Sequence, residues 1–227
     1  MSGLRQGSGP RVNPRDLVVV GGSAGSLGPL RALAAALPAD LPGSVLVTTH
    51  VGQSARSRLP WLLSRSGPLP AAHAMRGERL HPGRIYVAPP GSHLLVPAGV
   101  VVLSNGPRVK WSRPAVDVMF GSAARWFGDR VVAVVLSGLL DDGAVGAAQV
   151  AQAGGVVLVQ EPDEAAQSSM PLAALAAAEG ALAVPTKRLG ELVGGMLGEA
   201  GLVKWPHSEP LEEADPLKRC SGRLQSR

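Results

Sequence analysis

Three polar motifs in the chain contain residue types that could together form a nucleophilic site. The first is Gly21-Gly22-Ser23-Ala24-Gly25, a G-x-S-x-G pattern between an apolar run and a helical pattern. Such a pattern exposes a serine hydroxyl on a sharp strand-to-helix turn, near helix N–H groups that can hold a developing negative charge. Ser23 is therefore a candidate nucleophile for acyl transfer.

Two other interpretations of this glycine-rich turn stay open on the residues alone. A dinucleotide-binding loop requires G-x-G-x-x-G, but Ser23 stands at the second glycine. The next apolar run also ends in Thr48-Thr49-His50 rather than in an acidic residue, and the chain has no G-x-x-x-x-G-K-[ST] phosphate-binding loop. The third interpretation is a structural turn that happens to contain a serine.

The second and third motifs supply a histidine and a carboxylate. His50 directly follows the apolar run 44–49, and Asp141-Asp142-Gly143 comes shortly after the run 131–136. Taken singly, the histidine could be a hydrogen-bonded structural residue, and an aspartate before glycine could cap a helix. Taken together, the three motifs offer a nucleophile, a base and an orienting carboxylate, in which case their order along the chain is immaterial.

The hydropathy pattern predicts a scaffold that brings these motifs together. Uninterrupted apolar strands are predicted at 17–20, 44–49, 131–136, 156–160 and 181–184. Helices are predicted at 26–37, 57–63, 114–124, 143–153, 171–178 and 189–197. Apolar strands without in–out alternation, interleaved with helices, are typical of a parallel sheet covered on both faces. Ligand sites of such sheets lie beyond the carboxyl ends of the strands, where all three motifs are found.

The rest of the chain divides into a hairpin and two tails. Strands at 84–88, 93–96 and 100–103, with tight turns between them, predict an antiparallel hairpin at one end of the sheet. Residues 16–200 are predicted to form one domain, since 227 residues bury one sizeable core but not two. Segments 1–15 and 205–227, which are rich in Pro, Gly or mixed charge, are predicted to be flexible tails.

Composition excludes several function classes. A single cysteine, Cys220, rules out an internal disulfide and a cysteine zinc cluster, and favours a reducing, cytoplasmic location. No apolar run reaches the roughly 18 residues of a membrane span. The net charge of +5 is spread out and lacks interleaved aromatics, which make up only 3% of the chain, so nucleic-acid binding is not expected. The remaining histidines are scattered in the sequence, and neither a metal nor a cofactor is predicted.

Six segments carry a family resemblance. They are, in order, VVVGGSAGSLGPL, TTHVGQSARSRLPWLL, RIYVAPPGSHLLV, RPAVDVMFGSAA, VVLSGLLDDGAVG and VQEPDEAAQSSMPLAAL. Together they resemble the catalytic domain of CheB-type chemotaxis methylesterases, also called protein-glutamate methylesterase/protein-glutamine glutaminase. The resemblance extends over about residues 16–198.

This resemblance implies a role for each motif. It makes Ser23 the nucleophile, His50 the base and Asp142 the triad aspartate. It also implies that backbone N–H groups of Ala24 and Leu139 hold the oxyanion. The implied fold is a three-layer α/β/α sandwich, with a mostly parallel, doubly wound sheet and an antiparallel hairpin at one edge. The implied reaction is hydrolysis of glutamate γ-methyl esters on the cytoplasmic helices of chemoreceptors, with glutamine deamidation as a second activity and without a cofactor.

The chain departs from the family pattern in three places. Ser23-Ala24-Gly25-Ser26 stands where the family usually has Ser-Thr-Gly-Gly, and Gly138-Leu139-Leu140 stands for Gly-Met-Gly. The first 16 residues are too few for the receiver domain that family members often carry. We therefore expect activity that is either unregulated or regulated by a separate chain.

Arg113 has two interpretations. It lies four residues before Asp117, which predicts an i,i+4 ion pair at the start of a helix. The alternative is that Arg113 faces the site and guides an acidic receptor helix. Two further functions compete with the esterase: a non-catalytic docking module that keeps the fold, and a nucleotide-binding protein that uses the turn at 21–25.

Overall fold

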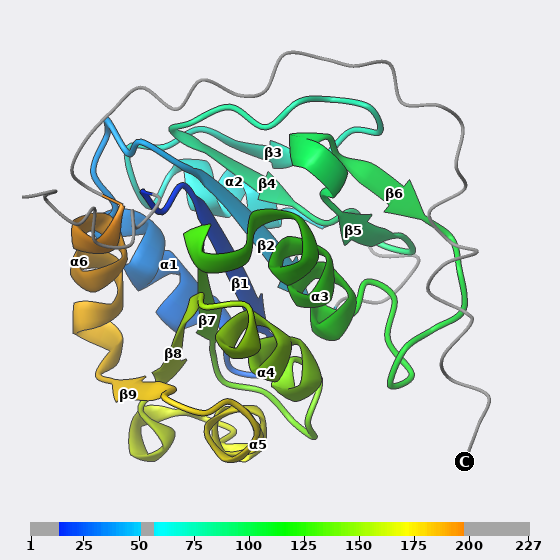
Figure 1. The fold of residues 1–227 in the computed structure, drawn as a ribbon. Helices are drawn as coiled ribbons and strands as arrows, with labels where there is room; N and C mark the ends of the chain where they lie inside the picture. Colours follow the sequence, from blue (N-terminus) through cyan, green and yellow to red (C-terminus); the bar gives the residue numbers. More distant parts are fainter. Residues whose placement is uncertain (1–13, 51–56, 198–227) are drawn as a thin grey trace, which may run out of the picture.

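The computed structural model describes residues 14–50 and 57–197. Its centre is a seven-stranded parallel sheet in the order β3-β4-β2-β1-β7-β8-β9 (Figure 1). The strands are β1 (Leu17–Gly22), β2 (Ser44–Thr49), β3 (Ala71–His73), β4 (Arg84–Val87), β7 (Val131–Val135), β8 (Val156–Gln160) and β9 (Leu182–Val184). A separate antiparallel pair consists of β5 (His93–Leu95) and β6 (Val102–Ser104).

Helices cover both faces of the sheet. One face carries α1 (Leu27–Ala36), α2 (Leu59–Ser64) and α6 (Thr186–Met196). The other carries α3 (Val116–Phe127), α4 (Ala144–Gln152) and α5 (Ser169–Ala177), together with the β5-β6 pair. Short 3-10 turns occur at Pro97–Gly99, Gly128–Arg130 and Pro162–Glu164. This arrangement confirms the predicted α/β/α sandwich with an added antiparallel hairpin.

The sheet buries both of its faces in apolar side chains. Along β1, Leu17 and Val19 point into the core on the α3-α4 side, whereas Val18 and Val20 point into the α1-α6 side. All four are at most 1% exposed. A strand that is buried on both faces needs apolar residues at every position, which explains the absence of in–out alternation in the sequence.

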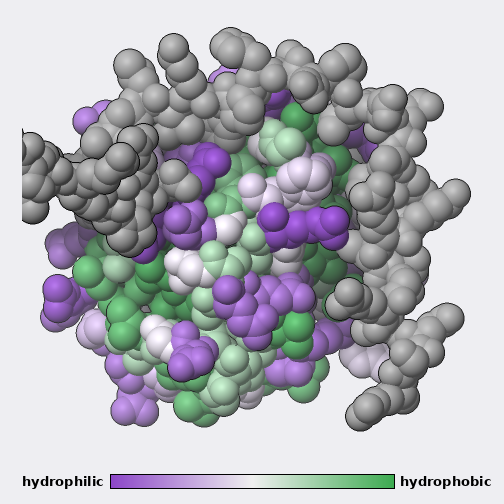
Figure 2. Space-filling view, viewed as in Figure 1, coloured by the Kyte–Doolittle hydropathy of each residue, from purple (hydrophilic) through white to green (hydrophobic). Residues whose placement is uncertain are grey.

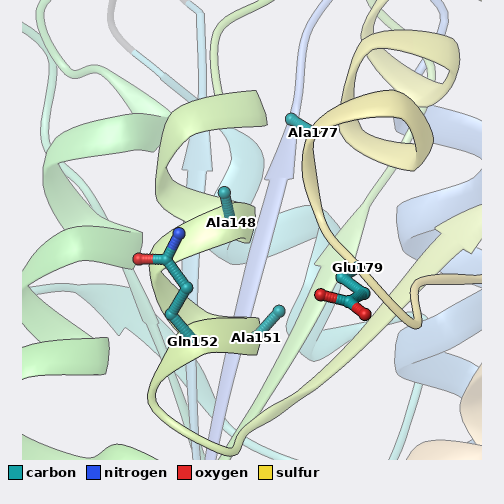
Figure 3. Close-up of a pocket in the computed structure, with 5 residues that line it drawn as sticks. All are labelled: Ala148, Ala151, Gln152, Ala177 and Glu179. Atoms are coloured by element: carbon teal, nitrogen blue, oxygen red, sulfur yellow. The ribbon is translucent and has the colours of Figure 1, made fainter.

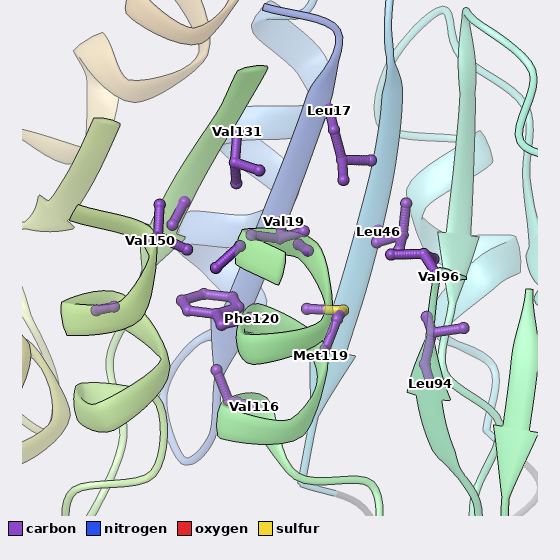
Figure 4. Packing of buried hydrophobic residues seen from close by; sticks show 14 of the residues in the cluster. Leu17, Val19, Leu46, Leu94, Val96, Val116, Met119, Phe120, Val131 and Val150 are labelled. Atoms are coloured by element: carbon purple, nitrogen blue, oxygen red, sulfur yellow. The ribbon is translucent and has the colours of Figure 1, made fainter. Parts of the chain in front are cut away.

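Close packing of α3 on α4 sets the distance between their N-termini. Phe120 and Met119 of α3 fill the core beside Val19 (Figure 4). Gly146 of α4 lies against this helix, and a Cβ built there would stand 2.5 Å from Phe120 Cβ. Without a side chain at Gly146, the helices approach closely enough for their ends to exchange hydrogen bonds. The face of the molecule in this view mixes hydrophilic and hydrophobic residues (Figure 2).

The structure corrects the predicted hairpin. The segment 84–88 is not part of it, since β4 lies inside the parallel sheet and pairs with both β2 and β3. The hairpin consists of β5 and β6 alone, and the three-residue β3 was not predicted. Tight turns suggested a continuous antiparallel unit, but strand pairing depends on long-range partners that a local pattern does not contain. Apart from residues 14 and 15, the predicted tails fall outside the described residues.

The sheet order places a switch point beside β1. The chain runs from β1 to β2 and β4 on one side, then returns to β7 on the other side of β1. The carboxyl ends of β1, β2 and β7 therefore lie side by side at one edge, the position where open α/β sheets bind ligands. Of the helices that the structure describes, none has the length and apolar character needed to cross a membrane.

Candidate active site

Ser23 lies on a tight turn between β1 and α1. The N–H of Ser26 donates to the carbonyl of Ser23 at 3.1 Å, and Gly25 has φ +81°, a conformation that glycine adopts without strain. The N–H of Ser23 donates to the carbonyl of Ser137, just beyond β7, at 2.9 Å. The turn is thus fixed to the neighbouring strand, with the Ser23 side chain at the carboxyl edge of the sheet.

His50 joins Ser23 to Asp142 in a continuous hydrogen-bonded chain. Its Nδ1 lies 2.9 Å from Ser23 Oγ, and its Nε2 lies 2.7 Å from Asp142 Oδ2. Because an ionised carboxylate can only accept, the imidazole carries its proton on Nε2. Nδ1 is then free to accept the serine proton. The structure therefore brings the three predicted residues together in the order required for a serine nucleophile.

The Asp142 carboxylate sits at the N-terminus of α3. Its Oδ2 accepts from the N–H of Val116 at 2.8 Å, and its Oδ1 accepts from the N–H of Asp117 at 2.9 Å. Burial opposes ionisation of this carboxyl, but the hydrogen bonds from His50 and the two N–H groups outweigh it and lower the pKa of Asp142 below its usual value. Asp142 is therefore a carboxylate at neutral pH, and it accepts from His50.

Asp117 of α3 accepts hydrogen bonds from the N-terminus of α4. Its Oδ1 accepts from the N–H groups of Gly143 and Gly146 at 2.9 and 2.8 Å, so each helix N-terminus holds a carboxylate from the other segment. Lys110 Nζ lies 3.1 Å from Asp117 and 2.9 Å from Asp141. Burial, together with the neighbouring charge of Asp142, raises the pKa of Asp117 despite these contacts. No sequence pattern pointed to Lys110 or to this exchange of carboxylates, because both depend on how α3 packs on α4.

The two predicted oxyanion donors lie on the loops that border Ser23. Gly138 immediately precedes Leu139 and abuts the serine, since a Cβ built on Gly138 would stand 2.8 Å from Ser23 Cβ and 2.0 Å from Met170 Sδ. The carbonyl of Gly138 accepts from the N–H of Met170 at 3.0 Å. Within the part of the chain that the structure describes, the N–H groups of Ala24 and Leu139 donate to no acceptor. Their role stays a prediction.

Comparison with known protein families shows to which family this chain belongs. The family model described as "CheB methylesterase" matches residues 18–193. The chain belongs to the CheB methylesterase family. The crystal structure of the Thermotoga maritima CheB methylesterase catalytic domain is similar, with a TM-score of 0.75 and 28% sequence identity over 80% of this chain and 98% of that one.

Curated relatives of this family extend the comparison. A protein-glutamate methylesterase/protein-glutamine glutaminase of Symbiobacterium thermophilum is 38% identical over 75% of this chain and 48% of its own length. One from Anaeromyxobacter dehalogenans is 36% identical over 85% and 57%. A putative member from Leptospira interrogans is 31% identical over 78% and 92%. The chain thus spans about half the length of the first two relatives and most of the third.

Arg113 does not pair with Asp117, so the predicted ion pair is wrong. Its Nη1 instead donates to the carbonyls of Asn105 and Gly106, both at 2.7 Å. The reason is that α3 begins at Val116 rather than at residue 114, so Arg113 precedes the helix and the i,i+4 geometry does not apply. Guidance of a substrate by Arg113 stays a prediction.

His93 is a buried histidine that holds the segment immediately before α3 in place. Its Nε2 donates to the Pro107 carbonyl at 2.9 Å, and its Nδ1 accepts from the N–H of Ala115 at 3.2 Å. Ala115 directly precedes the helix end that holds Asp142. Burial lowers the pKa of His93 below its ordinary value, with a further lowering from Arg113, although the bond to Pro107 opposes the shift.

This burial predicts a pH dependence of stability. The unfolded chain binds a proton at His93 with a pKa of about 6.5, whereas the folded chain resists it. Stability is therefore expected to fall as the pH drops below that value. Denaturant unfolding at pH 7.5 and 5.5 measures this, and a His93→Gln variant should lose less stability between the two. An equal loss in both proteins would contradict the shift.

No second site of comparable chemistry stands out in the described ranges. A hollow of about 280 Å³ lies beside α4, lined by Ala148, Ala151, Gln152, Ala177 and Glu179 (Figure 3). Its side chains include one carboxylate but no nucleophile or base. Across residues 14–50 and 57–197, no three His, Cys, Asp or Glu side chains are grouped as metal ligands would be.

Proposed function

We propose that this chain hydrolyses glutamate γ-methyl esters on chemoreceptors, releasing methanol and leaving a glutamate. The observation that carries the proposal is the hydrogen-bonded chain from Ser23 through His50 to Asp142, in a member of the CheB methylesterase family. Relatives named protein-glutamate methylesterase/protein-glutamine glutaminase support the same substrate class. Deamidation of receptor glutamines, with release of ammonia, is the second reaction that this chemistry serves.

The proposed mechanism has two halves. Ser23 Oγ attacks the ester carbonyl while Nδ1 of His50 takes the hydroxyl proton, and the new C–O bond gives a tetrahedral oxyanion. The N–H groups of Ala24 and Leu139 hold this oxyanion. The bond to the methoxy oxygen then breaks, His50 returns the proton, and methanol leaves. In the second half, His50 activates a water that releases the glutamate from Ser23.

Asp142 acts through His50 in this scheme. Its carboxylate fixes the imidazole proton on Nε2 and stabilises the imidazolium that forms during each proton transfer. Since the pKa of Asp142 is lowered, the carboxylate remains charged when the imidazolium appears. Side chains, backbone N–H groups and water carry out every step of the proposed reaction, which needs no cofactor.

The proposed partners are the cytoplasmic helices of methylated chemoreceptors, with a separate chain as a candidate regulator. Exposed apolar side chains border the catalytic loops, since Leu139 and Leu140 are 50% and 67% exposed and Trp111 is 88% exposed. The side chain of Lys110, next to Trp111, reaches the carbonyl of Asp141 at 2.8 Å. These residues, with Arg113 as a guide for acidic segments, form the proposed approach for the receptor helix.

The direct test is methanol release from methylated chemoreceptor membranes prepared from the same cell. We expect methanol to accumulate with the native chain and not in membranes without it, while unmethylated receptors carrying glutamine yield ammonia instead. A docking module would co-sediment with the same membranes without releasing either product. That result, obtained with cognate receptors, would overturn the esterase proposal.

A further inference from the structure

The peptide that joins Ser23 to Ala24 is held firmly at its carbonyl. Ser23 O accepts two hydrogen bonds from a single residue, one from Ser26 Oγ at 2.7 Å and one from Ser26 N at 3.1 Å. Ser26 itself is only 3% exposed. Because a trans peptide is planar, its C=O and N–H point in opposite directions. Fixing the carbonyl of Ser23 therefore also fixes the direction of the Ala24 N–H.

Two neighbouring polar groups of this turn are already occupied. The N–H of Ser23 donates to the carbonyl of Ser137, and the hydroxyl of Ser137 donates to the carbonyl of Ala24 at 2.8 Å. The Ala24 N–H, by contrast, has no acceptor among the described residues. The turn thus presents the Ala24 N–H as an unused donor next to the nucleophile, with its direction set from the far side of the same peptide.

The direction of the second predicted donor, the Leu139 N–H, is also set through the carbonyl of its own peptide. The carbonyl of Gly138 shares a peptide with the N–H of Leu139, and it accepts from the backbone N–H of Met170. That bond involves no side chain. At the first donor, by contrast, half of the support comes from a hydroxyl, which a substitution can remove.

We propose that Ser26 is a positioning residue that aims the Ala24 N–H at the oxyanion. This inference rests on the proposed function, in which that N–H holds the tetrahedral intermediate. The glycine that stands at this position in the family pattern has no hydroxyl to offer for this second hydrogen bond. The hydroxyl acts on the transition state through the peptide and does not touch the substrate.

The expected rate loss in Ser26→Ala depends on which hydrogen bond to the Ser23 carbonyl remains. Loss of a whole oxyanion donor lowers the rate about 10²–10³-fold. Ser26→Ala keeps the backbone bond from Ser26 N and loses only the hydroxyl, so the donor is loosened but still present. We expect the rate of the acylation step to fall about 10-fold, which is part of the full loss of the donor.

Labelling with an alkyl fluorophosphonate tests this without a receptor. Ser23 Oγ attacks phosphorus, the P–O bond forms, the P–F bond breaks and fluoride leaves, while His50 takes the proton. The phosphoryl oxygen occupies the place of the oxyanion. In Ser26→Ala the limiting labelling rate should fall about 10-fold, with the half-saturating probe concentration unchanged. Ser26→Thr, which keeps the hydroxyl, should retain most of the rate, and Ser26→Gly should behave like Ser26→Ala.

Ser44 offers a matched control. Its hydroxyl is also buried and donates to a backbone carbonyl, that of His81, at 2.8 Å. Ser44 lies at the start of β2, whereas His50 follows the end of that strand. We therefore expect Ser44→Ala to lower the melting temperature to a similar extent as Ser26→Ala while labelling at the native rate.

The outcomes separate the two proposals. If the native chain is not labelled at Ser23, the proposed nucleophile fails, and the role of Ser26 fails with it. If the native chain is labelled and Ser26→Ala matches its rate, the role of Ser26 is overturned while the proposed function stands. Equal slowing in Ser26→Ala and Ser44→Ala would assign the effect to general loosening, which also overturns the role.

Discussion

Replacing Ser23 by alanine is expected to lower the rate of methanol release from methylated chemoreceptor membranes about 10⁴–10⁶-fold. A fall of this size brings the release down to the assay background. Alanine removes the only atom that can form the covalent intermediate, and the remaining backbone donors cannot supply a nucleophile. Methanol released over time, normalised to folded protein, gives the measurement.

This loss should be chemical and not structural. Ser23 Oγ contacts His50, while the turn itself is held by backbone atoms and by Ser26 and Ser137, so the melting temperature should stay close to native. Ser92→Ala, which removes an exposed hydroxyl that bonds Asn105, serves as the control and should release methanol normally. Methanol release by Ser23→Ala at the native rate would remove Ser23 from its proposed role.

Asp142→Asn is the second large effect, with an expected fall in kcat of about 10³–10⁴-fold and little change in KM. Three donors converge on this carboxylate, namely His50 Nε2 and the N–H groups of Val116 and Asp117. An amide has one acceptor oxygen and one NH₂ group, so it must point a donor at another donor. If the NH₂ faces His50, the imidazole takes the other tautomer and can no longer accept the proton of Ser23.

The same substitution should also destabilise the fold. The Asp142 side chain is 2% exposed, so an N–H left facing the amide NH₂ loses its partner without access to water. Such a loss costs about 1–3 kcal/mol, which denaturant unfolding resolves. Asp141→Asn is the matched control, because that side chain is 61% exposed and its carboxylate contacts Lys110. Equal losses of kcat in the two variants would contradict the assignment of Asp142.

Several features of this protein follow from the sequence alone. Apolar strands without alternation predicted a parallel sheet buried on both faces, and Leu17–Val20 pointing alternately into two cores shows why that pattern is required. His50 stands directly beyond a predicted strand, and Ser23 follows another after Gly21-Gly22. Because parallel strands end at a common edge, their proximity could be predicted without knowing the full strand order.

Other features are explained only by the tertiary structure. The residue pattern alone did not separate Asp141 from Asp142, since both precede the same glycine, and the family resemblance selected Asp142 without a physical reason. The difference arises because α3 places two N–H groups against Asp142, while Asp141 stays at the surface with Lys110.

The tertiary structure also decided three other features. They are the pairing of β4, the contacts of Arg113 and the exchange of carboxylates between α3 and α4. Each depends on which segments meet after the chain has folded. Local pattern determines the type of an element and the residue at its end, because both follow from nearby side chains. The partner that a charged group meets depends on contacts between distant segments, and only the packed structure specifies them.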